Sequence, residues 1–96
     1  MRTLVAAAIG LGSVAAAVVA SAEPPAGAAS CTGCHPASSR VTSSVPRLAG
    51  LDRAAIVRAM QDFRSGQRAG TVMDRIAKGF TDDEIQAIAA WYATQK

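Results

Sequence analysis

The chain has 96 residues, a formal net charge of +3 and a 50% share of hydrophobic residues, but only 4% are aromatic. It contains two cysteines and one histidine, and it shows no Ser-His-Asp set and no phosphate-cradling glycine motif, which argues against an enzyme with catalytic groups of its own. If an N-terminal signal is removed, residues 23–96 fall in the size range of ~70–80 residues and below, where a domain usually needs a staple such as a disulfide set or a metal, because its buried area barely offsets the chain entropy.

The first 22 residues have the pattern of a secretory signal. Arg2 provides a positive start, residues 4–20 carry no charge, and small residues precede a cleavage site after Ala22. Cleavage within residues 26–29 is an alternative. A retained membrane anchor is a further alternative, but the run is rich in alanine, broken by glycines and shorter than the ~20 strongly apolar residues of a spanning helix. We therefore expect an exported, periplasmic protein without a membrane span in its mature form.

Residues 23–96 are then predicted to form a single domain whose first half has little regular structure. Loss of Arg2 with the signal lowers the net charge from +3 to +2. We expect a short helix to open near Ser30 and to run until Pro36 weakens it. Residues 37–50 are rich in serine and turn residues and include a proline, so they are predicted to form an irregular loop.

The next segment has the pattern of a regular helix over residues 53–63. Asp52 is a natural N-cap, and Gly66 and Gly70 follow the helix as stop signals. Apolar residues recur at helical spacing on one face. These are Ala55, Ile56, Ala59, Met60 and Phe63.

The last helix has the clearest start signal in the chain. A short segment closed by Gly79 precedes it, and Thr81 and Glu84 fit a capping box. Its apolar face is formed by Ile85, Ile88, Ala89 and Tyr92, with Trp91 beside it. No stretch alternates apolar and polar residues convincingly, so the sequence predicts an all-α fold with three main helices and a short one.

Both cysteines and the histidine fall within the stretch CTGCHP, residues 31–36. A disulfide between Cys31 and Cys34 would close a tiny loop and stabilise little, and it would leave His35 unexplained. A structural zinc site needs four ligands, and only carboxylates remain to complete the set. A thioredoxin-type pair is expected in a βαβ setting, which is missing. Cys-x-x-Cys-His is the attachment signature of c-type haem, and this interpretation fits all three residues and the predicted export.

A second axial ligand to the haem iron must come from elsewhere, because the chain has no second histidine. The candidates are Met60, Met73, Lys78 and Lys96. Met60 lies on the apolar face of a regular helix, where core packing explains it. Met73 follows a glycine-bearing loop before the capped last helix, where the backbone can bring a thioether over the haem, so it is the favoured ligand.

The sequence resembles the class I c-type cytochromes. The resemblance rests on CxxCH, on a PxLAG segment over residues 46–50, on FRSGQR and on VMDRIAKGFTDDEIQAIAAWYA. It is greatest to the haem domains of the cytochrome subunit of flavocytochrome c sulfide dehydrogenase and to cytochromes c4 and c5. It covers the chain from Ala29 to about Gln95 and implies a small single-haem cytochrome c fold.

The resemblance implies a role for each residue of the site. Cys31 and Cys34 would hold one haem c per chain through thioether bonds, with His35 as the proximal and Met73 as the distal ligand of the iron. The Pro46 carbonyl would accept the other ring N–H of His35 and fix the imidazole.

These ligands predict an electron-transfer protein rather than an enzyme. With histidine and methionine on the iron, no coordination position stays open for a substrate. We expect a haem subunit that accepts electrons from a flavin-dependent sulfide dehydrogenase, or alternatively a free monohaem shuttle serving other periplasmic redox proteins; no nucleic-acid partner is expected. Four basic residues near Met73 are candidates for steering an acidic partner. They are Arg64, Arg68, Arg75 and Lys78.

Overall fold

The computed structural model describes residues 10, 12, 13, 15 and 23–96, and the regular structure of this part is helical, without strands. Its elements are α1 (Ala28–Cys31), α2 (Arg53–Ser65), α3 (Met73–Ile76), the 3₁₀ turn η1 (Ala77–Gly79) and α4 (Asp82–Thr94). The predicted all-α fold is confirmed, although α1 ends at Cys31 instead of continuing toward Pro36. The predicted signal lies almost wholly outside the described residues and stays a prediction. Among the helices described, none has the length and apolar character needed to cross a bilayer.

The two long helices begin where the capping signals predicted, and α2 ends at the predicted stop signal Gly66. The Asp52 carboxylate accepts a hydrogen bond of 3.1 Å from the Ala55 N–H, and Gly66 ends α2 with a φ of 83°. At α4, the Thr81 hydroxyl accepts from the Glu84 N–H at 3.2 Å, and the Glu84 carboxylate accepts from the Thr81 N–H at 3.0 Å. These side chains satisfy backbone groups that a helix end leaves without partners.

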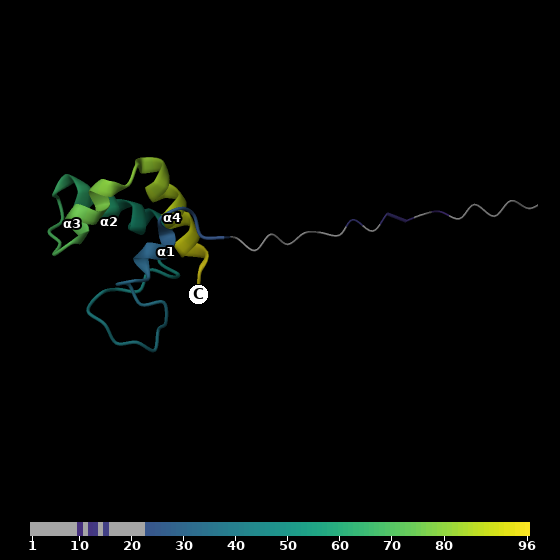
Figure 1. Ribbon diagram of the computed structural model, residues 1–96, viewed down its shortest axis with the longest axis horizontal. Coiled ribbons are helices and arrows are strands. Elements are labelled where there is room, and N and C mark those ends of the chain that lie inside the picture. The colour runs from purple at the N-terminus through teal and green to yellow at the C-terminus, as the bar shows by residue number, and fades with distance from the viewer. Residues whose placement is uncertain (1–9, 11, 14, 16–22) are drawn as a thin grey trace, which may run out of the picture.

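The hydrophobic core lies where α2 and α4 pack together and where α1 closes against them (Figure 1). Its buried members are Ala28, Ile56, Val57, Ile85, Ile88, Ala89 and Tyr92. The predicted apolar face of α4 is therefore confirmed in full. On α2 the buried face is rotated from the predicted one, since Val57 is buried and Ala55 is exposed. Burial of Val57 removes more apolar surface from water than burial of the smaller Ala55 would.

The long connection between α1 and α2 is irregular, as predicted, and hangs as a wide loop beside α1 (Figure 1). Hydrogen bonds at its base and near its end tie it down. The Arg47 side chain donates to the Ala37 carbonyl at 3.1 Å, and the Gly50 N–H donates to the Tyr92 carbonyl at 3.0 Å. The loop thus leaves α1, closes at its base where Arg47 meets Ala37, and returns to the last helix.

Candidate functional site

The CTGCHP stretch folds as a tight turn at the end of α1. The Cys31 carbonyl accepts hydrogen bonds from the Cys34 N–H at 3.2 Å and from the His35 N–H at 2.9 Å. Both cysteines are free thiols, with Cys31 half-buried against the core and Cys34 exposed. The turn therefore presents two unpaired sulfur atoms and the imidazole from one short piece of backbone.

The imidazole of His35 is held by the loop that follows it. Its Nδ1 lies 2.5 Å from the Pro46 carbonyl oxygen, 11 positions along the chain. A carbonyl oxygen can only accept a hydrogen bond, so Nδ1 carries the proton in this contact. With Nδ1 engaged in this way, Nε2 is the ring nitrogen left to face a metal, and metal-binding histidines commonly have this arrangement.

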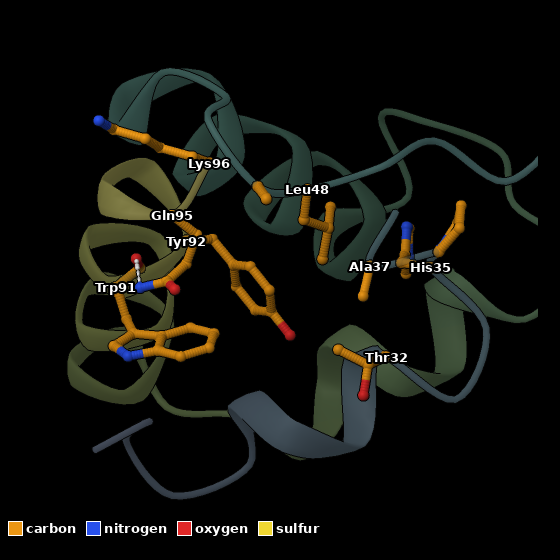
Figure 2. Close-up of a pocket in the computed structure, with 10 residues that line it drawn as sticks. Thr32, His35, Ala37, Leu48, Trp91, Tyr92, Gln95 and Lys96 are labelled. Carbon is orange, nitrogen blue, oxygen red and sulfur yellow. Dashed lines mark hydrogen bonds between the residues drawn. The ribbon is translucent and has the colours of Figure 1, made fainter. Parts of the chain in front are cut away.

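A small cavity lies beside the imidazole. It measures about 130 Å³, and Figure 2 shows His35 and Trp91 on opposite sides of it, with the Tyr92 ring directed between Leu48 and Thr32. A space of this size holds a few water molecules by volume and is too small for a macrocycle. The cavity lies between the loop and the end of α4, where the Gln95 side chain donates to the Trp91 carbonyl at 3.2 Å (Figure 2).

The two methionines named as candidate ligands have different surroundings. Met60 packs against the core, as predicted. Met73 is the first residue of α3, is half-buried and stands outside the core cluster. Its neighbours Val72 and Ile76 expose 50% and 44% of their surface. This end of the molecule thus carries a thioether among uncovered apolar side chains, which suits an apolar ligand.

The residues present fit haem c better than they fit zinc or a disulfide. Across residues 23–96, no three His, Cys, Asp or Glu side chains converge as a metal site, so the zinc hypothesis finds no ligand set there. The thiols of Cys31 and Cys34 remain free, which leaves both available for thioether bonds. The imidazole of His35, held at Nδ1 by the Pro46 carbonyl, would offer Nε2 as a nitrogen ligand beside them.

Burial raises the pKa of two side chains in and beside the turn, Cys31 and Tyr92. It raises the pKa of the Cys31 thiol, which keeps this residue neutral at ordinary pH. Burial, together with the neighbouring Cys31 thiol, raises the pKa of Tyr92 to about 12. The phenol therefore stays protonated, and it donates a 2.5 Å hydrogen bond to the carbonyl of Ala28.

Two contacts around the site had no signal in the sequence. The Tyr92–Ala28 bond joins residues 64 positions apart and locks α4 to α1. Arg64, predicted as one of four solvent-facing basic residues, instead donates to the Phe80 carbonyl at 3.3 Å and forms an ion pair with Asp82. Spacing along the chain carries no information about either pair of partners.

The fold and these residues are those of a small helical protein with a c-type haem attachment sequence. No family model matches the chain. It is 41% identical over 63 residues to the "Cytochrome subunit of sulfide dehydrogenase" of Chlorobaculum tepidum, covering 66% of this chain and 57% of that protein. It is 38% identical over 65 residues to the "Thiosulfate dehydrogenase electron acceptor" of Stutzerimonas stutzeri, covering 66% of this chain and 30% of that protein.

A relative of similar length completes the comparison. "Cytochrome c-554(548)" of Halomonas halodenitrificans is 30% identical over 70 residues, which cover 69% of this chain and 84% of that cytochrome. The chain belongs to the class I c-type cytochromes, a family of electron-transfer proteins that carry covalently bound haem c with its iron. It spans only 57% and 30% of the sulfide and thiosulfate dehydrogenase relatives, respectively.

Proposed function

We propose that Cys31 and Cys34 hold the haem c of this cytochrome through thioether bonds and that His35 and Met73 are the axial ligands of its iron. The observation that carries the proposal is the hydrogen bond between His35 Nδ1 and the Pro46 carbonyl. It orients an imidazole that belongs to the same turn as the two thiols. When bound, haem c supplies a one-electron redox couple. The proposed domain comprises residues 23–96.

The residues of the chain would set the conditions for this couple. The Pro46 carbonyl keeps the proton of His35 on Nδ1 and orients the ring, which raises the basicity of Nε2 as a ligand. A methionine sulfur as the opposite ligand raises the reduction potential relative to two imidazoles. No coordination position is left for a substrate, so single-electron transfer is the activity that this set of ligands supports.

For the partner, we propose a flavin-dependent sulfide dehydrogenase in the periplasm, with this chain as its electron-accepting haem subunit. The support is the 41% identity to a cytochrome subunit of sulfide dehydrogenase. A free shuttle that serves other oxidoreductases is the second candidate, because two further relatives are named as electron acceptors of thiosulfate dehydrogenase. Purification from the native source separates the two: a flavoprotein that stays bound through gel filtration supports the subunit, and an isolated monohaem protein supports the shuttle.

A pyridine haemochrome assay on the purified protein tests the attachment. The native chain should give the spectrum of haem c with two saturated vinyl groups. Replacement of one cysteine, Cys31→Ser or Cys34→Ser, should leave at most one thioether and shift the haemochrome maximum to longer wavelength with a lower yield of holoprotein. Normal covalent haem content in the double variant would refute the assignment of both cysteines.

A further inference from the structure

The segment that carries Met73 is closed by one arginine. We call residues 66–81, between the ends of α2 and α4, the Met73 segment. Arg64 lies in the last turn of α2, and its guanidinium donates to the Phe80 carbonyl at 3.3 Å and pairs with the Asp82 carboxylate at the start of α4. One side chain thus joins the two ends of the segment.

The first part of the same segment folds back on α2. The Arg68 guanidinium lies 4.7 Å from the centre of the Phe63 ring, and the Arg68 N–H donates to the Asp62 carbonyl at 3.1 Å. Gly70 passes so close that a Cβ there would lie 2.9 Å from the Phe63 ring. These contacts hold the N-terminal part of the segment. Arg64 then holds its C-terminal end, through Phe80 and the adjoining Asp82.

We propose that Arg64 is a positioning residue that keeps the Met73 segment closed and so keeps the Met73 sulfur on the haem iron. The proposal rests on Met73 being the distal ligand, as argued above. A guanidinium has a planar fork of donors that serves two acceptors at once, whereas the ammonium of lysine is a point charge. Loss of the guanidinium would free the C-terminal end of the segment, and the Met73 sulfur would then leave the iron more often.

The two bonds of Arg64 do not hold the Met73 segment equally strongly. The Arg64 side chain is 31% exposed and that of Asp82 is 71% exposed, so their ion pair is screened by solvent. The bond to the Phe80 carbonyl is partly buried and has a charged donor. Hydrogen bonds of this kind contribute more to stability than bonds between neutral groups. Removal of the guanidinium should therefore have a larger effect than removal of the Asp82 charge.

Competition with external imidazole measures this closure. Imidazole binds the ferric iron only when the sulfur has left, and it then abolishes the weak far-red sulfur-to-iron absorption band of the holoprotein. We expect Arg64→Gln to retain its haem and its band, and to bind imidazole about tenfold more tightly than the native protein. Arg64→Lys should lie between the two, because it keeps the charge but loses the fork.

Matched variants separate closure from general destabilisation. Arg53 also joins α2 to α4, through a 3.1 Å bond to Gln86, but at the opposite end of α2, so Arg53→Gln should bind imidazole as the native protein does. Asp82→Asn should strengthen binding by a smaller factor than Arg64→Gln. Asp83→Asn removes a neighbouring charge from the first turn of α4 and should have no effect on imidazole binding.

Each outcome decides between the alternatives. Equal imidazole affinity for Arg64→Gln and the native protein, or for Arg64→Gln and Arg53→Gln, would overturn the role of Arg64 while leaving Met73 as the ligand. If Arg64→Gln yields no holoprotein, equal affinities for Asp82→Asn and Asp83→Asn would overturn it. A native protein that lacks the band altogether would overturn both the ligand and its closure, and this result is recognised before any variant is made.

Discussion

His35 takes its orientation from a residue outside its own turn. The Pro46 carbonyl meets Nδ1 at 2.5 Å, and proline holds this part of the loop at a fixed φ angle. A flexible residue at this position would have to lose conformational freedom to keep the same contact. The orientation of the proposed iron ligand, an imidazole with Nδ1 engaged and Nε2 free, is therefore set by the loop as well as by the motif.

The choice of Met73 over Met60 gives a prediction at this scale. Met73→Ala should abolish the far-red sulfur-to-iron band and lower the reduction potential, because the iron loses a ligand that favours its reduced form. Met60→Leu conserves volume in the core and should change neither. Absorption spectra and redox titrations of the holoproteins check both variants, and loss of the band in Met60→Leu alone would reverse the assignment.

Tyr92 gives a second prediction. Tyr92→Phe removes the hydrogen bond to the fully buried Ala28, and an unsatisfied buried acceptor costs about 1–3 kcal/mol. The free energy of unfolding in urea should fall by an amount in this range at neutral pH. Trp91 stacks edge-on against Tyr92 at 4.8 Å and packs on the core, so Phe at position 92 preserves that contact and isolates the hydroxyl.

The same residue predicts the alkaline limit of stability. The pKa of Tyr92 is raised to about 12 in the folded protein, against about 10 in an unfolded chain. Because the folded state disfavours the phenolate, this contribution to stability is fully present below pH ~10 and is lost as the pH rises toward 12. Tyr92 is the only tyrosine of the chain, so phenolate absorbance reports it directly. A midpoint near 10 in the folded protein would contradict the burial argument.

At the scale of the elements, α4 is stabilised from its first turn. Thr81 and Glu84 satisfy each other's backbone N–H groups, and Asp82 and Asp83 place negative charge at the positive end of the helix dipole. α1 has only four residues and no side-chain cap, and it is held by the Tyr92 hydrogen bond to Ala28. The longer helix thus determines the position of the shorter one, which leads into the turn proposed to attach the haem.

The capping box predicts an acid dependence. The hydrogen bond from the Thr81 N–H lowers the pKa of Glu84, so its contribution is present above the ordinary carboxyl value of about 4.3 and is lost as the pH falls below it. Glu84→Gln keeps an acceptor but cannot titrate. Urea midpoints at about pH 6 and pH 3 should therefore differ less in Glu84→Gln than in the native protein. If Glu84→Gln shows the same difference between the two midpoints as the native protein, the loss of stability in acid comes from other carboxylates. Asp83→Asn, which removes a neighbouring carboxylate, is the control.

At the scale of the whole molecule, basic residues of the Met73 segment remain free to meet a partner. Arg75 and Lys78 are exposed, whereas Arg64 is engaged with Asp82 and Arg68 packs on Phe63. The surface proposed to steer an acidic partner therefore reduces to Arg75 and Lys78. Electrostatic steering of this kind acts on the rate of encounter and weakens with salt.

Charge reversal tests this surface. Arg75→Glu with Lys78→Glu should slow electron transfer from the partner flavoprotein several-fold at low salt, without a change in the haem spectrum. Arg58→Glu with Lys96→Glu makes the same change in net charge outside the segment and should have a smaller effect. Stopped-flow rates at increasing salt measure the difference, and equal rates for both double variants at all salt concentrations would remove this surface from the docking proposal.

Features that depend on neighbours along the chain could be predicted from the sequence alone. The caps at Asp52 and Thr81, the apolar face of α4 and the turn at Gly66 follow from spacing and residue type, and the structure confirms them. The cofactor was predictable for the same reason, since CxxCH gathers the residues proposed to attach the haem within five positions. Such features need only local backbone geometry, which the local sequence specifies.

Contacts between distant segments became visible only in the folded chain. It selected Val57 over Ala55 for the core, joined Tyr92 to Ala28 and turned Arg64 from the solvent toward Phe80 and Asp82. The partners of these residues lie 16 to 64 positions away along the chain. Whether they meet depends on how α2 and α4 rotate against each other as they bury apolar surface, and that rotation is set by the packing of the whole core.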